Sequence, residues 1–241
     1  MEVFFAAYVV NEFELTGRTR THITQLEGPR VALHRDVVAP FLALRDEAAR
    51  DGMDIVASSA FRDFDAQVDI WNRKYRGERP LYDRDGRPRE HASLNEEEIV
   101  EAILVWSAVP GASRHHWGTE IDIYDRAALP DGYRVQLLPA EYQSDGIFWR
   151  LAGWLDENIH RFGFYRPYDE DRGGVFPEPW HISFAPIASR ALASLTEEVI
   201  AAALRESNVL GKECVLERLS EVYQRYVANV AVPPAGVTRL A

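Results

Sequence analysis

The chain has 241 residues, a mass of 27.4 kDa and a formal net charge of −11 at pH 7. This size suits one well-filled core, or one domain with an appendage. The acidic charge argues against nucleic acid and anionic membranes as partners, and no apolar run approaches the roughly 20 residues of a membrane-spanning helix. The lone Cys214 excludes an internal disulfide framework and a cysteine-rich metal cluster, so histidines and carboxylates must hold any metal.

The N-terminal segment 3–10 is apolar and predicts a buried first strand. It lacks the basic region and the small-residue cleavage site of a signal peptide. We therefore expect a cytoplasmic protein, and export stays open if Met1 replaces a removed leader. Residues 11–35 are polar and contain several threonines, which predicts short strands or an ordered loop.

Two helices with a strand between them are predicted next. Apolar residues recur at helical spacing after Asp36, a candidate N-cap, and Gly52 lies just past the end of this helix. The short apolar run 55–61 fits a buried strand that delivers Arg62 at its end. Asp63 is the predicted N-cap of the second helix. Its apolar stripe comprises Phe64, Val68, Trp71 and Tyr75.

A long surface segment follows the second helix. Residues 77–93 contain two prolines, two glycines and many charges, which predicts a loop and a candidate flap. Asn95 and Glu98 form a predicted capping box for a helix that runs to about Trp106. The pair Pro110-Gly111 then breaks this helix.

The segment Glu120–Tyr124 alternates polar and apolar residues, as a half-buried strand does. Asp122 therefore points away from Ile121 and Ile123, and Glu120 shares its face. Residues 126–146 predict a second loop insertion.

The C-terminal part is predicted to be mostly helical. Apolar spacing from residue 147 predicts a helix that ends at Gly163, and Phe164 begins a strand. Two further helices are expected at about 196–206 and 212–227. The tail after residue 231 is expected to fray.

Glu178 and His181 lie in the stretch 175–184, which does not read as a regular strand. Their odd separation would place them on opposite faces of such a strand, because the side-chain period is two. Pro177 and Pro179 argue against regular pairing there. They predict a kink that turns both side chains toward one point.

Helices and strands are intermixed without a regular βαβ cadence. This pattern favours an α+β fold, a single domain with a small, largely antiparallel sheet flanked by helices, plus C-terminal helices. We expect a catalytic domain over residues 1–190 and a helical extension over residues 191–241.

Four side chains together predict a hydrolytic site with a single metal. Imidazole nitrogens and carboxylate oxygens are usual ligands of a catalytic zinc, which has three protein ligands and an open fourth position. His115, Asp122 and His181 can supply these three ligands, and Glu178 is the carboxylate beside the open position.

Three separate motifs carry a family resemblance. They comprise Ser59, Arg62 and Gln67, then Ser113, His115, Gly118 and Asp122, and finally Glu178, Trp180 and His181. In this order they resemble the signature of the LAS metallopeptidases, which include the D-alanyl-D-alanine carboxypeptidases and dipeptidases associated with vancomycin resistance. The matching segments span about residues 55–185 and stop before the C-terminal helices.

The resemblance implies one Zn²⁺ held by His115, Asp122 and His181, with Glu178 as the general base. Arg62 looks like the family's substrate-binding arginine. Its planar fork of donors suits a terminal carboxylate or a developing oxyanion, and sequence alone does not separate these roles.

Gln67 and Ser113 stand where the family places supporting polar contacts with the substrate. The implied activity is that of a zinc D,D-carboxypeptidase. It would remove the terminal D-alanine from peptidoglycan stem peptides or from a small peptide containing D-Ala-D-Ala.

Several alternatives stay open at this point. An L,D-carboxypeptidase, a dipeptidase or a cell-wall endopeptidase of the same family would use the same ligands, and the loops 77–93 and 126–146 decide between a closed pocket and an open groove. A non-catalytic, zinc-stabilised module that binds cell-wall peptides is the alternative from another class. Glu178 argues against it, because a structural zinc needs no free carboxylate.

The chain also departs from the family pattern. Glu120 stands where a small residue is usual, and it is placed to tune the metal, contact a substrate amine or narrow the pocket. Phe61 and Asp63 replace the usual tyrosine and serine beside the arginine. His116 is predicted to support the site or form the pocket wall. Ordinary packing or surface roles are expected for His22, His34, His91 and His160.

Overall fold

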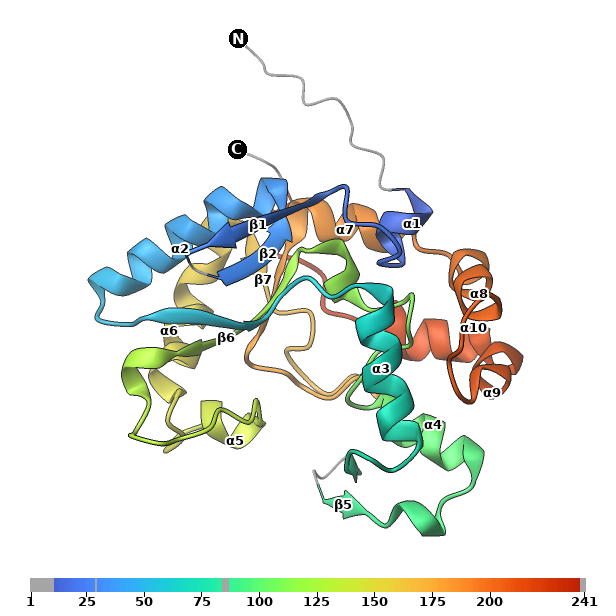
Figure 1. The fold of residues 1–241 in the computed structure, drawn as a ribbon. Helices are drawn as coiled ribbons and strands as arrows, with labels where there is room; N and C mark the ends of the chain where they lie inside the picture. Colours follow the sequence, from blue (N-terminus) through green and yellow to red (C-terminus); the bar gives the residue numbers. More distant parts are fainter. Residues whose placement is uncertain (1–10, 29, 84–86, 239–241) are drawn as a thin grey trace.

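A four-stranded antiparallel sheet lies at the centre of the computed structural model, which describes residues 11–28, 30–83 and 87–238 (Figure 1). Its strands, in spatial order, are β3 (Ile55–Ser59), β6 (Glu120–Asp125), β8 (His181–Phe184) and β7 (Phe164–Tyr165). Two small antiparallel pairs are β1 (Ile23–Glu27) with β2 (Arg30–His34), and β4 (Leu81–Tyr82) with β5 (Pro88–Arg89). The predicted α+β class is therefore confirmed.

The central sheet has one apolar and one polar face, because side chains alternate along each strand. On the apolar face, Ile121 of β6 pairs with Ile182 of β8, and both are fully buried. On the polar face, Asp122 pairs with His181. The strand register thus fixes two of the predicted metal ligands side by side.

Helices α2 (Val38–Arg50) and α6 (Trp149–Asn158) cover the apolar face. Phe41 of α2 and Leu151 of α6 are fully buried in one hydrophobic cluster with Ile123 of the sheet. Each such side chain contributes on the order of 1.5–3 kcal/mol through its burial. This layer anchors the sheet that holds the site.

A second hydrophobic cluster is formed by seven further helices, most of which are drawn on the right of Figure 1. These are α1 (Glu12–Leu15), α3 (Phe64–Tyr75), α4 (Glu96–Leu104), α7 (Ala185–Ser194), α8 (Glu197–Arg205), α9 (Lys212–Glu217) and α10 (Leu219–Val222). Trp71 of α3 is fully buried and donates its indole N–H to the carbonyl of Leu210 at 2.9 Å. The C-terminal helices therefore pack directly on α3, and a domain boundary at residue 190 stays a prediction.

The predicted helix caps at α3 and α4 are confirmed. The Asp63 carboxylate accepts a hydrogen bond from the backbone N–H of Ala66 at 2.9 Å. Asn95 and Glu98 form a reciprocal capping box, and α4 ends at Leu104, two residues before the expected end. Both caps satisfy N–H groups that a helix start leaves without partners.

Other expectations differ from the structure. The strand expected at residues 3–10 lies outside the described residues. Helix α7 was not predicted, because it follows β8 without a polar turn. The helix expected at 212–227 is divided at Arg218 into α9 and α10, and a short π-helical stretch, Tyr223–Val227, follows α10.

The frayed tail expected after residue 231 stays a prediction, but the chain is held at Ala231 and Val237. The backbone N–H of Ala231 donates to the carbonyl of Pro167 at 2.9 Å, and Ala231 and Val237 are both buried. Their apolar cluster with Tyr165 and Ala185 compensates for the conformational entropy lost on ordering.

Short segments around the sheet include α5 (Pro139–Tyr142) and the 3-10 turns Arg35–Val37 and Ile159–Phe162. In the described ranges, no helix is both long enough and apolar enough to span a membrane. The cellular location stays a prediction.

Candidate active site

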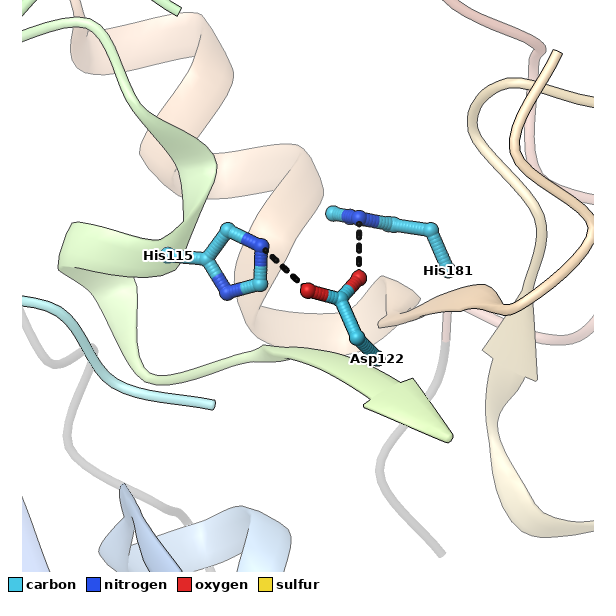
Figure 2. A group of neighbouring side chains, drawn as sticks. All are labelled: His115, Asp122 and His181. Atoms are coloured by element: carbon cyan, nitrogen blue, oxygen red, sulfur yellow. Dashed lines mark ion pairs between the residues drawn. The ribbon is translucent and has the colours of Figure 1, made fainter. Parts of the chain in front are cut away.

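His115, Asp122 and His181 come from three different elements and converge on one point (Figure 2). His115 lies in the 3-10 turn Arg114–Trp117, Asp122 on β6, and His181 at the first position of β8. One ligand atom from each residue lies within 4.8 Å of the other two. Two imidazoles and a carboxylate at this spacing can hold one metal ion.

The Asp122 carboxylate lies between the two imidazoles and turns one oxygen toward each (Figure 2). Its Oδ2 lies 3.4 Å from Nε2 of His115, and its Oδ1 lies 3.1 Å from Nδ1 of His181. Asp122 Oδ1 and His181 Nδ1 are buried, and neither makes a hydrogen bond. Buried polar atoms of this kind normally have a partner. A metal ion between the three side chains would provide it, so the donor set fits a metal.

Gly118 sets the position of His115 relative to β6. It ends the 3-10 turn with a φ of 67°, a left-handed conformation that favours glycine. A Cβ at this position would lie 2.6 Å from the backbone nitrogen of His34 and 2.4 Å from Cδ1 of Ile23. The turn therefore needs glycine both for its backbone conformation and for its close approach to β1 and β2.

Each imidazole is fixed by a hydrogen bond on the nitrogen that faces away from Asp122. His115 Nδ1 contacts the carbonyl of Ala60 at 2.7 Å, and His181 Nε2 contacts Oε2 of Glu120 at 2.8 Å. Both partners are acceptors, so these nitrogens carry the protons. His115 Nε2 then presents a lone pair to a metal, and His181 Nδ1 presents one once a metal displaces the proton from it.

The electrostatics favour positive charge at the point where the ligands meet. Burial lowers the pKa of His115 to about 3, which keeps its imidazole neutral. Burial also acts to lower the pKa of His181, but Asp122, Glu120 and Glu178 outweigh it and raise that pKa well above its ordinary value. In the metal-free site, the three carboxylates therefore favour a proton on His181. A bound metal cation would balance the same negative charges in place of that proton.

Glu178 reaches the site through a turn that ends where β8 begins. The backbone N–H of His181 donates to the carbonyl of Glu178 at 3.0 Å, and Glu178 Oε2 lies 3.2 Å from His181 Nδ1. The irregular backbone predicted from Pro177 and Pro179 is confirmed, because β8 starts only at His181. Burial raises the pKa of Glu178, although its contact with His181 opposes the shift.

Arg62 is held in a defined orientation just after β3. Its Nη1 donates to Oε1 of Gln67 at 2.8 Å, and its Nη2 donates to Oγ of Ser59 at 3.0 Å. Gln67 is fully buried and donates its own N–H to the carbonyl of Ala108 at 2.7 Å. Gln67 therefore acts on the pocket through Arg62, and a direct contact of Gln67 with a substrate stays a prediction.

A cavity of about 380 Å³ opens beside the three ligand candidates. Arg62, Ser113 and Glu178 line it together with the ligands. The loops singled out in the sequence also reach it, through Tyr82 of the first loop and Leu137 of the second. The predicted flap therefore forms part of the pocket wall.

Leu137 has a φ of 54°, which a residue with a large side chain rarely adopts. The buried carboxylate of Glu141 holds this turn by accepting hydrogen bonds from the backbone N–H groups of Gln136 and Leu138, at 3.1 and 2.9 Å. The strained turn fixes an apolar wall of the pocket. No pattern in the sequence indicated this turn.

Glu120 is fully buried and does not line the pocket. Besides His181, it accepts hydrogen bonds from Ser183 Oγ at 2.7 Å and Thr119 Oγ1 at 2.8 Å, and it forms an ion pair with Arg114 at 3.2 Å. Of the three roles considered for Glu120, the contact with a substrate amine and the narrowing of the pocket are wrong. The remaining role is to tune the metal ligand His181, because Glu120 contacts the imidazole on the side away from Asp122.

His116 points away from the pocket, and its predicted place in the pocket wall is wrong. Its Nδ1 contacts the carbonyl of Arg62 at 2.7 Å, and its Nε2 accepts a hydrogen bond from the backbone N–H of Gly111 at 3.1 Å. It therefore supports the site by fixing the backbone at Arg62. Three cations that the sequence did not single out, Lys74, Arg79 and Arg114, line the pocket instead.

The model of the VanY family, described as D-alanyl-D-alanine carboxypeptidase, matches residues 30–187. The chain belongs to the VanY family. This match contains the whole candidate site, it bears out the resemblance to LAS metallopeptidases, and it indicates a peptidase that acts on cell-wall peptides. It ends within α7, before the C-terminal helices α8 to α10.

The chain is also similar to individual relatives and to solved structures. An uncharacterized protein of Haemophilus influenzae is 39% identical over 121 residues, which cover 49% of this chain and 92% of the relative. A D-alanyl-D-alanine carboxypeptidase of Enterococcus faecalis is 31% identical over 157 residues, which cover 62% of this chain and 47% of the relative. The crystal structure of a vancomycin-resistance D,D-pentapeptidase VanY in complex with Zn(II) has 26% identity, a TM-score of 0.49, and coverage of 71% of this chain and 84% of that chain.

Proposed function

We propose that this chain is a zinc-dependent D,D-carboxypeptidase that hydrolyses the terminal D-Ala-D-Ala bond of peptidoglycan stem peptides. The observation that carries the proposal is the convergence of His115, Asp122 and His181 beside Glu178, at a pocket of a VanY family member. A peptidase needs an activated water and a group that moves its proton, and these four residues are suited to supply both.

Zn²⁺ is the metal we propose, held by His115 Nε2, His181 Nδ1 and the Asp122 carboxylate. Three ligands of this kind match a catalytic zinc site and leave one position open. When bound, zinc lowers the pKa of water toward neutrality and polarises a carbonyl as a Lewis acid. The hydrogen bonds from His115 to Ala60 and from His181 to Glu120 hold both imidazoles in the orientation that binding requires.

Glu178 is the proposed general base. Its carboxylate takes a proton from the attacking water and later delivers it to the nitrogen of the leaving amine. Burial raises the pKa of Glu178 from its ordinary value and so makes its carboxylate a stronger base. A carboxylate with a raised pKa keeps the proton until it is delivered to the leaving amine.

Arg62 is proposed to stabilise the charge that develops on the scissile carbonyl oxygen. Its guanidinium is fixed by Gln67 and Ser59, so little reorganisation is needed during the reaction. The nearby charges of Asp122 and Glu178 oppose the lowering of its pKa by burial. Ser113 lines the same pocket and is the proposed supporting polar contact with the peptide.

The test measures release of D-alanine by the zinc-loaded protein. A pentapeptide stem that ends in D-Ala-D-Ala, a tetrapeptide stem and free D-Ala-D-Ala are compared as substrates. We expect turnover of the pentapeptide above both others. A preference for the tetrapeptide would instead identify an L,D-carboxypeptidase, and a preference for the free dipeptide would identify a dipeptidase.

Two variants complete the test. Glu178→Ala should bind zinc and release no D-alanine, at least about 100-fold below wild type. Glu170→Ala, which removes an exposed carboxylate that pairs with Arg172 outside the site, should match wild type. Equal activity of Glu178→Ala and wild type would overturn the assignment of the base, and no activity in wild type would favour a non-catalytic module that binds peptides.

A further inference from the structure

Lys74 and Arg79 line one side of the pocket, and among the described residues neither has a carboxylate partner. Lys74 lies in the last turn of α3, and Arg79 follows it in the segment that leads to β4. Lys74 Nζ donates a hydrogen bond to Oγ of Ser107 at 2.7 Å. Within the part of the chain that the structure describes, no Asp or Glu forms an ion pair with either residue.

The neighbouring cations at the same end of α3 behave differently. Arg73 lies within 3.9 Å of Asp69 and 3.6 Å of Glu78, and Arg76 also pairs with Glu78. The chain has 38 acidic residues against 27 basic ones, so carboxylates are plentiful. Two pocket-lining cations without an acidic partner in such a chain are suited to an anion that comes from outside.

The position of Lys74 along α3 places it beyond Arg62. Gln67, Ile70 and Lys74 are spaced by three and four residues, so they share one face of the helix. Gln67 holds Arg62, and Ile70 and Lys74 line the pocket. Lys74 is about 10 Å further along the helix than Gln67, at 1.5 Å per residue. Long helical side chains lean toward the helix N-terminus, which directs the Lys74 ammonium back toward Arg62.

The charges that act on Arg62 and on Lys74 agree with a position of Lys74 further from the metal ligands. Asp122 and Glu178 act on Arg62, which therefore lies close to the metal ligands. The charges that act most on Lys74 are those of Arg79, Glu178 and Arg62. Burial and the nearby Arg79 lower the pKa of Lys74 to about 8. An anion bound between Lys74 and Arg79 would relieve their repulsion.

We propose that Lys74 and Arg79, with Ser107, form a carboxylate subsite that binds the free C-terminal carboxylate of the residue that leaves. This inference rests on the proposed function, because it assigns the end of the peptide that the enzyme cleaves. Arg62 then remains for the carbonyl oxygen of the scissile bond. A subsite for a free carboxylate selects a chain end and so favours a carboxypeptidase over an endopeptidase.

The first test compares two peptides that end in D-Ala-D-Ala, one with a free carboxylate and one with a C-terminal amide. The zinc-loaded wild type should cleave the acid with a kcat/KM roughly 100-fold above that of the amide, because the amide leaves two cations unpaired. Lys74→Met keeps the apolar stem and should reduce this preference to roughly tenfold or less, mainly through KM. Arg79→Gln should act in the same direction.

Arg73→Gln is the matched control, because it removes a positive charge from the adjacent position outside the pocket and should keep the full preference. Thermal unfolding of each variant checks that it folds. A wild type that cleaves acid and amide equally would overturn the subsite. An undiminished preference in both Lys74→Met and Arg79→Gln would also overturn it.

A binding measurement separates this inference from the proposed function. Calorimetry with zinc-loaded Glu178→Ala compares the acid, the amide, and an amide that has a glutamate before the D-alanines. Tighter binding of the acid, lost in Glu178→Ala/Lys74→Met, supports the subsite even if wild type shows no turnover. If Lys74 instead strengthens binding only of the glutamate peptide, the subsite takes a side-chain carboxylate and the terminal assignment is overturned.

Discussion

Substitution of Glu120 by glutamine should destabilise the metal-free protein and weaken its binding of zinc. Burial acts to raise the pKa of Glu120, but Arg114 and the hydrogen bonds from His181 and Ser183 outweigh burial and lower that pKa to about 2. The difference of about 2.5 pH units from an ordinary glutamate corresponds to about 3 kcal/mol in favour of the ionised form. Loss of one partner from a buried ion pair costs a similar amount, about 3–5 kcal/mol.

Two measurements follow from this magnitude. Urea unfolding of metal-free Glu120→Gln should show a loss of about 3–5 kcal/mol, because Arg114 is left buried without its counter-charge. Competition with a chelator should show zinc affinity reduced by about 10- to 100-fold, because His181 loses a charged acceptor on Nε2.

A double variant and a control separate the two effects. Glu120→Gln/Arg114→Met removes both charges and should recover part of the stability, whereas zinc affinity should stay low. Glu141→Gln removes another buried carboxylate, which accepts hydrogen bonds only around the turn at Leu137, so it should lower stability and leave zinc affinity unchanged. Wild-type zinc affinity in Glu120→Gln would refute the reasoning.

Three further predictions concern stability and pH. Gly118→Ala should lower the free energy of unfolding by at least about 2 kcal/mol in urea, because alanine is strained at a φ of 67° and its Cβ meets the backbone nitrogen of His34; an unchanged midpoint would contradict this. Burial lowers the pKa of His34 to about 4. Between pH 6.5 and 4, His34 therefore binds a proton in the unfolded chain but not in the folded chain. As the pH falls through this range, His34 should lower the free energy of unfolding by about 3 kcal/mol. His34→Asn should reduce that slope in urea titrations, and an equal slope would exclude His34 as its source. Burial and Arg79 lower the pKa of Lys74 to about 8, and Arg62 and Glu178 also face this side chain. Above pH 8 Lys74 loses its positive charge, so the KM of wild type for a peptide with a free carboxylate should rise. Lys74→Met should show no such rise, and a parallel rise in both proteins would assign it to another group.

The local placement of the candidate ligands could be predicted from the sequence, because each one depends on neighbouring residues. Alternation along β6 put Asp122 on the face opposite Ile121, and the prolines beside Glu178 indicated the irregular turn before His181. The caps at Asp63 and Asn95 likewise depend on residues three positions away. Interactions of this range can be read along the chain.

The supporting interactions depend on contacts between distant segments and were not predicted. Glu120 meets Ser183 only because β6 pairs with β8 in one register. Lys74 faces the pocket only because α3 packs on the C-terminal helices through Trp71. The charge of Glu120 could be seen in the sequence, but its pairing with Arg114 needs the fold.

Anomalous diffraction from crystals of the zinc-loaded protein, measured at the zinc absorption edge, tests the central claim most directly. We predict a single strong peak about 2.0–2.2 Å from His115 Nε2, His181 Nδ1 and the Asp122 carboxylate. His181 Nε2 should remain on Glu120 in that structure. A peak held by other residues, or no peak between these three side chains, would contradict the proposed metal site and the mechanism that depends on it.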